Sequence, residues 1–490
     1  MHGPHEPAWE FYRDQFDFIA RNNWVFQTGI PRIDIAIWQK MTVYPGHIEA
    51  RTYQPTDLEE MGYSYEYISP DNLDLPAVKI VNKVLAPDAQ AFKAFVLRRN
   101  DSLTLQGVSK LVEFANAGLP IVFAGGKPSI FVGTAAPTVQ RQALRDIETI
   151  SRLPNVHVTD SYLVASTIES LGIDPLTKIS TNASWYTYWR FDPVTDVDYI
   201  FIYNDAMYIP QGQGASEGSI EFQSTKIPYE YNAWTGDKKP ILSYNTTNSS
   251  TIISLRLAGN QSTIVAFEPP IANLSNAARV PNVAGDILGS NIVGEKITLK
   301  MKTPTTLALP LSNWSLTVEH WDPPVDLYNY TYGASKHNTT HQLSGLVPWL
   351  DIPGLQNVSG RGYYSTTFNW PPISNDNNSA AEDGAFIDFG FIYHTLRAYV
   401  NGRQLPPLDV TEARADIKEY LVSGTNTVEA VVATPLGNVL RPIWWQLMSS
   451  GEGPGSADAG PDHGFVEPPQ GKYGLQAEVV VYPYVEMELT

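Results

Sequence analysis

The spacing of apolar residues changes along the chain, and each change predicts a different architecture. The opening shows intervals of three and four residues, typical of one apolar face of a helix that ends near residue 23. The residues at this spacing are Trp9, Tyr12, Phe16 and Ile19. An amphipathic helix needs a partner surface, and none precedes this one in the chain.

From there to about residue 175, strand-like apolar runs alternate with segments of helical period. Strands are expected at residues 32–38, 79–85, 91–97, 120–126 and 156–160, and helices at residues 105–115, 139–150 and 163–171. Alternation of this kind makes a parallel, doubly wound α/β layer. We therefore predict a flavodoxin-like α/β domain over residues 32–180.

Beyond Ser180, short β-branched and aromatic runs such as DYIFIYND and STIVAFEP lie between Gly, Pro and Asn turns. This pattern predicts an all-β sandwich over residues 181–298. A further β-rich block, residues 299–490, has strands at the spacing of a jelly roll. Two polar segments, residues 336–341 and 449–469, are predicted to be exposed loops. The fold class is therefore multidomain, α/β plus all-β.

The composition and charge exclude two classes of partner. The 490 residues carry a net charge of −18 with a pI near 4.9, so nucleic acid and anionic membranes would repel the protein. With 43% hydrophobic and 17% charged residues, the chain is globular. No apolar run reaches the length of about 18 residues that a membrane helix needs.

Acceptor sequences for N-glycosylation, Asn-x-Ser/Thr, are dense and lie mostly in polar, turn-like stretches. They begin at Asn100, Asn182, Asn245, Asn248, Asn260, Asn273, Asn313, Asn329, Asn338, Asn357 and Asn377. We expect a secreted, extracellular glycoprotein; the alternative is that these residue types are simply common in loops. No basic and apolar leader follows Met1, so we expect the signal peptide to belong to an upstream part.

Several segments resemble large exo-glycosidases. YEYNAWTGDKKP (residues 229–240) is similar to a Trp-Thr-Gly turn in the sandwich after their barrel. HTLRAYVNGRQL (residues 394–405), with GRGYYSTTF ahead of it, is similar to their galactose-binding-like jelly roll. The opening, residues 1–38, resembles the last loop and helix of a (β/α)8 barrel leading into an α/β domain, which EEMGYSYEYISPDNL and DAQAFKAFVL fit. The chain thus resembles glycoside hydrolase family 106, the α-L-rhamnosidase-like proteins, and in particular their long secreted fungal members.

The resemblance implies four parts. These are a barrel remnant (residues 1–31), an α/β domain (32–180), a β-sandwich (181–298) and a galactose-binding-like jelly roll (299–490). In the family, the catalytic carboxylates and a calcium site belong to the barrel, and nearly all of that barrel is missing here. We therefore assign no catalytic residue, expect no cofactor, and expect the chain alone to be inactive.

Three functions stay open. The first is that of accessory and supporting domains of a secreted α-L-rhamnosidase-like enzyme acting on plant or microbial polysaccharide. The second is a stand-alone, non-catalytic protein that binds carbohydrate or has a structural role, and the third is a fragment whose function is that of its missing half. The opening helix discriminates among them. An apolar face without a partner favours the first or third, whereas a helix packed on the α/β domain favours an independent protein.

A first candidate set for sugar binding lies near residue 65. A glycosidase holds two carboxylates roughly 5–10 Å apart across a sugar. The acids with aromatic neighbours are Glu6, Glu66 and Asp71. Tyrosine rings can stack on sugar faces and a carboxylate can bind hydroxyls, so we predict that Tyr63, Tyr65 and Glu66 contact substrate. The alternative is a turn whose rings pack over the α/β domain.

The carboxy-terminal block holds a second candidate set, in which Trp faces would stack on a sugar and polar side chains would bind its hydroxyls. The predicted residues are Trp370, His394, Arg397, Trp444 and Trp445, accompanied by Asp388, Tyr393, Asn401 and Arg441. Read as a strand, RPIWWQL points its adjacent tryptophans to opposite faces, so at most one serves a site. Asn401 and Gly402 are typical of a hairpin turn. The alternative is that these side chains pack the core.

Two other motifs point away from metals and nucleotides. His2, His5 and Glu6 lie close in sequence but have no further ligand nearby, so we expect no metal there. FAGGKPSIF (residues 123–131) is a glycine turn after a strand, but it misses the phosphate-binding spacings. In addition, Pro128 breaks the helix that would cradle a phosphate.

Overall fold

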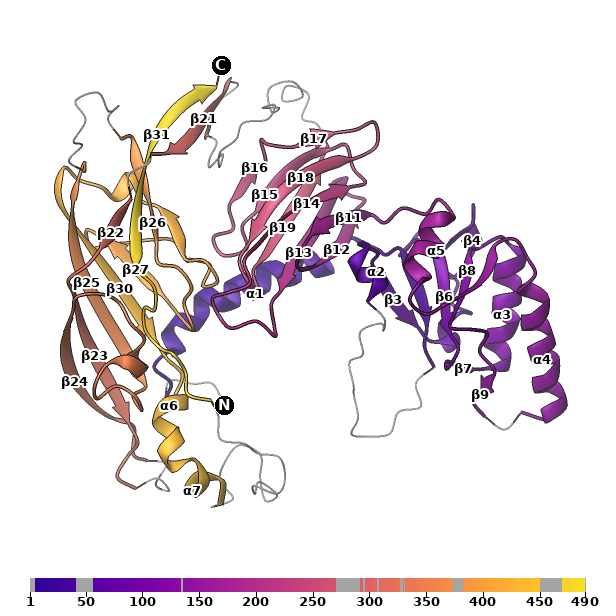
Figure 1. Cartoon of the computed structure of the whole chain (residues 1–490), viewed down its shortest axis with the longest axis horizontal. Coiled ribbons are helices and arrows are strands. Elements are labelled where there is room, and N and C mark those ends of the chain that lie inside the picture. Colours follow the sequence, from indigo (N-terminus) through magenta and orange to yellow (C-terminus); the bar gives the residue numbers. More distant parts are fainter. Residues whose placement is uncertain are drawn as a thin grey trace.

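The computed structural model describes residues 5–40, 56–133, 135–269, 291–293, 296–305, 308–326, 329, 331–372, 382–449 and 469–489. The features expected at His2, Asn273, Asn377 and residues 450–468 lie outside these ranges. Figure 1 shows three bodies in a row: an α/β body, a first β block in the middle and a second β block at the other end. The long helix α1 lies along both β blocks.

The α/β body, residues 35–170, is built on a five-stranded parallel sheet in the order β10-β8-β6-β2-β3. Its strands are β2 (Ile35–Trp38), β3 (Tyr65–Ile68), β6 (Ala94–Arg98), β8 (Ile121–Ala124) and β10 (Val156–Thr159). Its helices are α2 (Asp57–Glu60), α3 (Leu105–Asn116), α4 (Pro137–Ile150) and α5 (Val164–Ser170). Apolar residues of α3 and α4 pack on one face of the sheet and those of α2 and α5 on the other. The predicted parallel layer with helices on both faces is confirmed.

One predicted strand of this body is wrong. Residues 79–85 form a hairpin of two short strands, β4 (Ile80–Val81) and β5 (Val84–Leu85). Asn82 and Lys83 between them have φ of 52° and 67°, which is the left-handed backbone that a two-residue hairpin turn requires. A second pair of short strands, β7 (Ser102–Leu103) and β9 (Ile130–Phe131), lies beside the main sheet.

The first β block consists of two antiparallel sheets, in the orders β1-β12-β13-β19-β15-β16 and β11-β14-β18-β17. The strands are β1 (Ile30–Arg32), β11 (Thr177–Thr181), β12 (Ser184–Asp192), β13 (Val197–Asp205), β14 (Ser216–Phe222), β15 (Ile227–Tyr231), β16 (Lys238–Pro240), β17 (Asn245–Thr246), β18 (Thr251–Leu257) and β19 (Ser262–Glu268). Trp189 and Phe267 from one sheet pack against Phe222 from the other. The predicted pair of sheets sharing one core is therefore present.

The second β block also has two sheets. One has the order β20-β21-β31-β26-β29, with β22 paired to β31, and the other has the order β24-β23-β25-β30-β27-β28. The strands are β20 (Asn291–Val293), β21 (Lys296–Pro304), β22 (Leu309–Leu311), β23 (Trp314–Asp322), β24 (Ser335–Leu343), β25 (Gly360–Trp370), β26 (Gly384–Asp388), β27 (Arg397–Val400), β28 (Arg403–Gln404), β29 (Arg414–Asp416), β30 (Gly424–Ala433) and β31 (Val479–Leu489). Trp314, Trp349 and Tyr364 are buried in its core.

Two predictions for the second β block are wrong, and one is confirmed. Residues 336–341 are not a loop but belong to the edge strand β24, whose polar side chains hid it. RPIWWQL is helical, spanning a 3-10 turn (Arg441–Ile443) and α7 (Trp444–Ser449) after α6 (Gly437–Leu440), so the strand alternation does not apply. Asn401 and Gly402, with φ of 53° and 73°, form the predicted hairpin turn.

Helix α1 (Tyr12–Gln27), preceded by a 3-10 turn (Trp9–Phe11), joins the two β blocks. Val25 packs on β13 and β19 of the first block, and Phe18 stacks on Trp234 with ring centroids 4.4 Å apart. At the other end, Phe11 and Tyr12 pack against Ala433 of the second block. The helix is one turn longer than predicted and lies against the β blocks. None of the helices in the described ranges is long and apolar enough to cross a membrane.

Candidate functional site

Arg397, predicted to bind sugar, binds the amino-terminal segment in the structure. Its Nε lies 3.1 Å from Asp14 Oδ2, and its Nη2 donates to the Glu10 carbonyl at 2.7 Å. The guanidinium also lies 4.7 Å from the centroid of the Phe11 ring. Arg361 on β25 supports the same segment by donating to the Pro7 carbonyl at 2.9 Å. These two arginines hold the start of α1 on the second β block.

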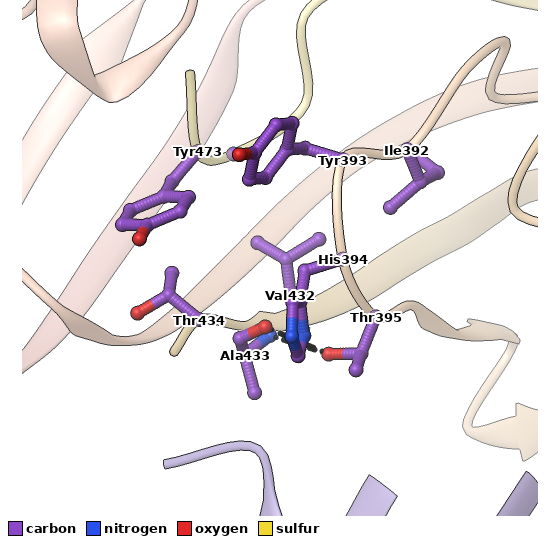
Figure 2. A pocket seen from close by; sticks show the side chains of 9 residues that line it. Ile392, Tyr393, His394, Thr395, Val432, Ala433, Thr434 and Tyr473 are labelled. Atoms are coloured by element: carbon purple, nitrogen blue, oxygen red, sulfur yellow. Dashed lines mark hydrogen bonds between the residues drawn. The ribbon is translucent and has the colours of Figure 1, made fainter. Parts of the chain in front are cut away.

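His394 lies beside Arg397, at the wall of a small cavity shown in Figure 2. The His394 carbonyl accepts a hydrogen bond from Gln15 of α1 at 3.0 Å, and its ring is 6.0 Å from that of Tyr12. Tyr393 and Tyr473 form another wall, with ring centroids 5.6 Å apart. The cavity volume is about 10 Å³, which is room for one water molecule rather than a sugar ring.

Trp370 is far from this cavity. Arg397 pairs with Val431 of β30, which pairs with Tyr363 of β25. Trp370 is seven residues further along β25, a distance of about 23 Å at ~3.3 Å per residue. Its side chain packs, partly buried, against the core of the second block. The structure therefore brings together His394 and Arg397 but not Trp370.

A larger hollow lies next to Trp370 in sequence. Its volume is about 620 Å³, within the ~300–1,000 Å³ of typical ligand pockets. It is lined by Leu309, Ser312, Asn313, Ser365, Phe368 and Asn369, with their chain neighbours. Among the described residues, neither this hollow nor the cavity at His394 is lined by Asp or Glu. Both lack the pair of carboxylates that glycoside hydrolysis requires.

Trp444 and Trp445 lie on α7, which Figure 1 shows at the end of the second block, beyond α6. Trp445 is 41% exposed and Trp444 is half-buried. A helix places neighbouring residues about 100° apart, so the two rings do not oppose each other as strand residues would. Their part in sugar binding stays a prediction.

The first candidate set, Tyr63, Tyr65 and Glu66, lies in the α/β body, at the other end of the molecule. The buried Tyr63 donates its hydroxyl to the Ile173 carbonyl at 2.5 Å. Tyr65 donates to Glu59 Oε1, also at 2.5 Å. Because side chains alternate along β3, Glu66 faces away from Tyr65 and accepts a hydrogen bond from Gln90 at 3.4 Å. The three side chains therefore do not converge on one ligand.

Carboxyl groups in this region have shifted pKa values. Burial raises the pKa of Glu66, and burial likewise raises the pKa of Glu59 above its usual range. At the exposed Asp71 a hydrogen bond from Lys40 lowers the pKa. The third acid, Glu6, lies in the amino-terminal segment, where it accepts a hydrogen bond from the Tyr12 hydroxyl at 2.5 Å. These acids have neighbours within the protein, and none of them lines the cavity or the hollow described above.

The glycine turn at residues 123–131 does not lead into a helix. Gly125 and Gly126 have positive φ after β8, but the chain continues into β9, and α4 begins only at Pro137. A glycine turn that binds phosphate is followed directly by the amino terminus of a helix. The glycine turn therefore leads into a strand and not into a helix.

Sequence reasoning missed a cluster of His320, Asp322 and His337. One ligand atom of each residue lies within 4.8 Å of the others. His320 is buried, its Nε2 is 2.8 Å from Thr339 Oγ1, and His337 Nδ1 is 2.8 Å from Asp322 Oδ2. Burial, and then the neighbouring His337, lower the pKa of His320. The alternation of His337, Thr339 and His341 is the signal that the sequence offers, but a polar segment of this kind predicts an exposed loop.

The sequons that the structure describes are accessible. The asparagines at 100, 182, 245, 248, 260, 313, 338 and 357 are exposed, and Asn329 is half-buried. A glycan at any of the exposed positions other than Asn313, which lines the hollow described above, would extend into solvent. This is compatible with the secretion that the sequence predicts, which stays a prediction.

The comparisons concern the fold. The structure of a rhamnosidase from Novosphingobium sp. PP1Y superposes with a TM-score of 0.62 at 19% identity, over 97% of this chain and 41% of that one. An α-L-fucosidase isoenzyme 2 from Paenibacillus thiaminolyticus matches with a TM-score of 0.35 at 8% identity, over 52% of this chain and 51% of that one. An exo-carrageenase from Bacteroides ovatus gives 0.28 at 10% identity, over 49% and 29%. These two scores are too low to support an argument.

No protein-family profile matches the chain, and no curated protein matches it either. The chain spans about two fifths of the length of the rhamnosidase that it matches. Its three bodies and α1 thus have, almost in their entirety, the fold of part of a rhamnosidase structure.

Proposed function

We propose that this chain supplies the accessory and supporting domains of a secreted α-L-rhamnosidase-like glycoside hydrolase of family 106 that acts on plant or microbial polysaccharide. The observation that carries the proposal is the match of 97% of this chain to 41% of a rhamnosidase. Under this proposal the reacting carboxylates belong to a barrel outside these residues. The lack of carboxylates around the cavity and the hollow described above supports it.

The exposed face of α1 supports the same proposal. Three of the four residues of the predicted apolar stripe, Trp9, Phe16 and Ile19, are 41%, 55% and 48% exposed, whereas the fourth, Tyr12, is buried against the second β block. Fully burying one such side chain stabilises a protein by ~1.5–3 kcal/mol. Three neighbouring exposed apolar side chains therefore form a surface that a further part of the protein could cover. Under the proposal, residues 1–31 are the last loop and helix of the barrel, and the stripe packs against the rest of it.

The finer fold assignments belong to the proposal as well. In chain order the strands of the parallel sheet run 2-1-3-4-5, the flavodoxin-like order, which supports a domain at residues 32–180. The two antiparallel sheets of the second β block support a galactose-binding-like jelly roll at residues 299–490, after a β-sandwich at residues 181–298. The proposed partner is a polysaccharide or oligosaccharide.

The test uses antibodies raised against the purified chain to capture the protein from the secreted fraction of its source. The expected product is a polypeptide much larger than 54.3 kDa that hydrolyses an aryl α-L-rhamnoside, while the purified chain alone does not. A captured polypeptide of about the mass of this chain plus glycans, without hydrolytic activity, would refute the proposal. Turnover by the purified chain would refute it from the other side.

A second candidate is a stand-alone, non-catalytic carbohydrate-binding protein. The hollow of about 620 Å³ beside Phe368 and Asn369 favours it, because its volume suits a sugar and it offers an aromatic ring and amide groups. Binding of the purified chain to a glycan array, with loss of binding in Asn369→Ala, would support this candidate. Binding that survives this substitution would place the sugar elsewhere.

A further inference from the structure

The edge hairpin of the second β block places three metal-binding side chains, two histidines and one aspartate, on one face. Strand β24 lies at the edge of its sheet and pairs with β23 in antiparallel register. His320 of β23 is directly opposite His337 of β24. Asp322 is two residues beyond His320, so its side chain leaves the same face of the sheet.

The inner end of this face is fixed. Leu316 and Val318, on the same face of β23, are fully buried in the core, and His320 continues their line with 6% exposure. Its Nε2 and the Thr339 hydroxyl are 2.8 Å apart, and the His341 Nε2 lies 3.1 Å from the same hydroxyl. Burial and the contact with Thr339 therefore fix the position of the His320 imidazole.

The outer end of this face, formed by His337 and Asp322, is exposed to solvent and lies close to His320. The rings of His320 and His337 are stacked, with centroids 4.2 Å apart and planes inclined by 26°. His337 Nδ1 lies 2.8 Å from Asp322 Oδ2, and these two side chains are 54% and 39% exposed. The candidate ligand atoms of all three residues lie within 4.8 Å of one another.

We infer that His320, Asp322 and His337 form a binding site for a divalent first-row transition metal ion such as Zn²⁺, with a fourth position open to water. Two imidazoles and one carboxylate suit zinc and its neighbours, whereas Ca²⁺ and Mg²⁺ prefer oxygen ligands alone. The site shares no residue with the cavity at His394 or with the hollow beside Phe368, and it does not depend on the proposed function.

The geometry requires only a modest change on binding. Bonds of ~2.0–2.2 Å in a tetrahedral site place ligand atoms about 3.3 Å apart, so atoms up to 4.8 Å apart must close by at most ~1.5 Å. His337 Nδ1 and Asp322 Oδ2, which are 2.8 Å apart, must separate by about 0.5 Å where both serve as ligands. Rotation of the exposed His337 and Asp322 side chains supplies this movement while Thr339 holds His320. Asn338, a sequon asparagine, points to the opposite face of β24, so a glycan there leaves the site accessible.

The test is titration of the full chain, stripped with chelator and freed of any affinity tag, with ZnCl₂ by calorimetry and with CoCl₂ by visible absorption. We expect one saturable Zn²⁺ per chain and a Co²⁺ spectrum of low coordination number, with no comparable response to CaCl₂ or MgCl₂. Loss of a partner that merely orients a ligand weakens metal binding by ~10–100-fold, so His337→Ala, which removes a ligand, is expected to cost at least about 100-fold. Asp322→Asn is expected to cost at least about 10-fold.

His337 and Asp322 are exposed, so both variants are expected to keep the fold, which circular dichroism checks; His320→Ala alone would not separate folding from binding. His5→Ala is the matched control, because His5 is exposed and lies outside the cluster, and it is expected to leave the affinity unchanged. Absence of saturable Zn²⁺ binding would overturn the inference. So would an affinity that His337→Ala leaves intact or that His5→Ala abolishes, because the metal would then sit elsewhere.

Discussion

Replacing Arg397 by alanine is expected to loosen the amino-terminal half of α1 from the second β block. Arg397 contacts that segment in three ways: the ion pair with Asp14 at 3.1 Å, the hydrogen bond to the Glu10 carbonyl at 2.7 Å, and the stack on Phe11 at 4.7 Å. The side chains of Arg397 and Asp14 are 24% and 23% exposed, so water weakens the pair only in part.

The size of the effect follows from these contacts. A hydrogen bond to a charged group contributes ~1.5–3 kcal/mol, and a cation–π contact at a partly exposed site ~0.5–1 kcal/mol. Solvent screening and the lost freedom of a long side chain reduce the sum. We therefore expect a cost of about 2 kcal/mol in the local opening of α1, which is about 30-fold in the opening equilibrium at ~1.36 kcal/mol per tenfold.

Hydrogen–deuterium exchange measures this opening directly, because amides of α1 exchange when the helix leaves the surface. Peptides covering residues 9–20 are expected to exchange about 30-fold faster in Arg397→Ala. Arg13→Ala is the matched control: Arg13 lies on the same helix, is 80% exposed and pairs with Asp17 at 3.2 Å. An exposed pair of this spacing is worth ~0.3–0.5 kcal/mol, so about a twofold change is expected.

Equal exchange in the two variants would refute the reasoning, since α1 would then be held without Arg397. The same experiment bears on sugar binding. If Arg397→Ala abolishes binding to a glycan array while exchange of α1 is unchanged, the arginine acts on the ligand and not on the helix. We expect the reverse, because its Nε and Nη2 already donate to the amino-terminal segment.

Three further predictions concern stability and surface chemistry. Trp349→Ala removes a fully buried indole whose Nε1 donates to the Tyr364 hydroxyl at 2.8 Å, so the second β block is expected to lose ~3–5 kcal/mol and melt earlier; Trp445→Ala, at an exposed ring, is expected to leave the melting temperature unchanged. Burial raises the pKa of Glu59, so the folded state binds more protons than the unfolded chain and loses stability as the pH rises from the unfolded pKa of about 4.3 through the higher folded value. Glu59→Gln is therefore expected to raise the melting temperature at pH 7 and not at pH 4, and an equal rise at both would contradict the assignment. Produced in a secretory host, the chain is expected to lose mass on treatment with an N-glycan-releasing enzyme, with Asn100 and Asn338 among the modified residues, and an unmodified product would contradict the secretion hypothesis.

Much of the fold could be predicted because burial is periodic within each element. Helices α3, α4 and α5 and strands β2, β6, β8 and β10 arise where apolar residues recur at the helical or strand period. The structure buries most of those residues, although Val139, Val158 and Leu163 are about half exposed. The failures share a cause. Residues 336–341 form a strand through hydrogen bonds to β23, which need no apolar pattern at a sheet edge, and Asn82 and Lys83 turn inside a run that is apolar on both sides.

The candidate site residues could be predicted less well than the helices and strands. Tyr63, Tyr65 and Glu66 are adjacent in sequence, and strand alternation separates the tyrosine at 65 from the carboxylate at 66. Trp370 and Arg397 share residue types that suit a sugar site, but the strand register places them far apart along the sheet of the second β block. Chemistry at a site depends on side chains meeting in space, and adjacency along the chain does not report that.

From its residue order alone this protein is an acidic, cysteine-free assembly of one α/β and two β-rich parts, because charge and the local period of apolar residues are properties of the chain itself. Folding in three dimensions set the rest. It placed α1 across two β blocks with Phe16 uncovered, and it brought His320 opposite His337. Such pairings depend on strand register and on contacts between distant segments. The free energy of those contacts depends on both segments, so no short stretch of sequence determines it.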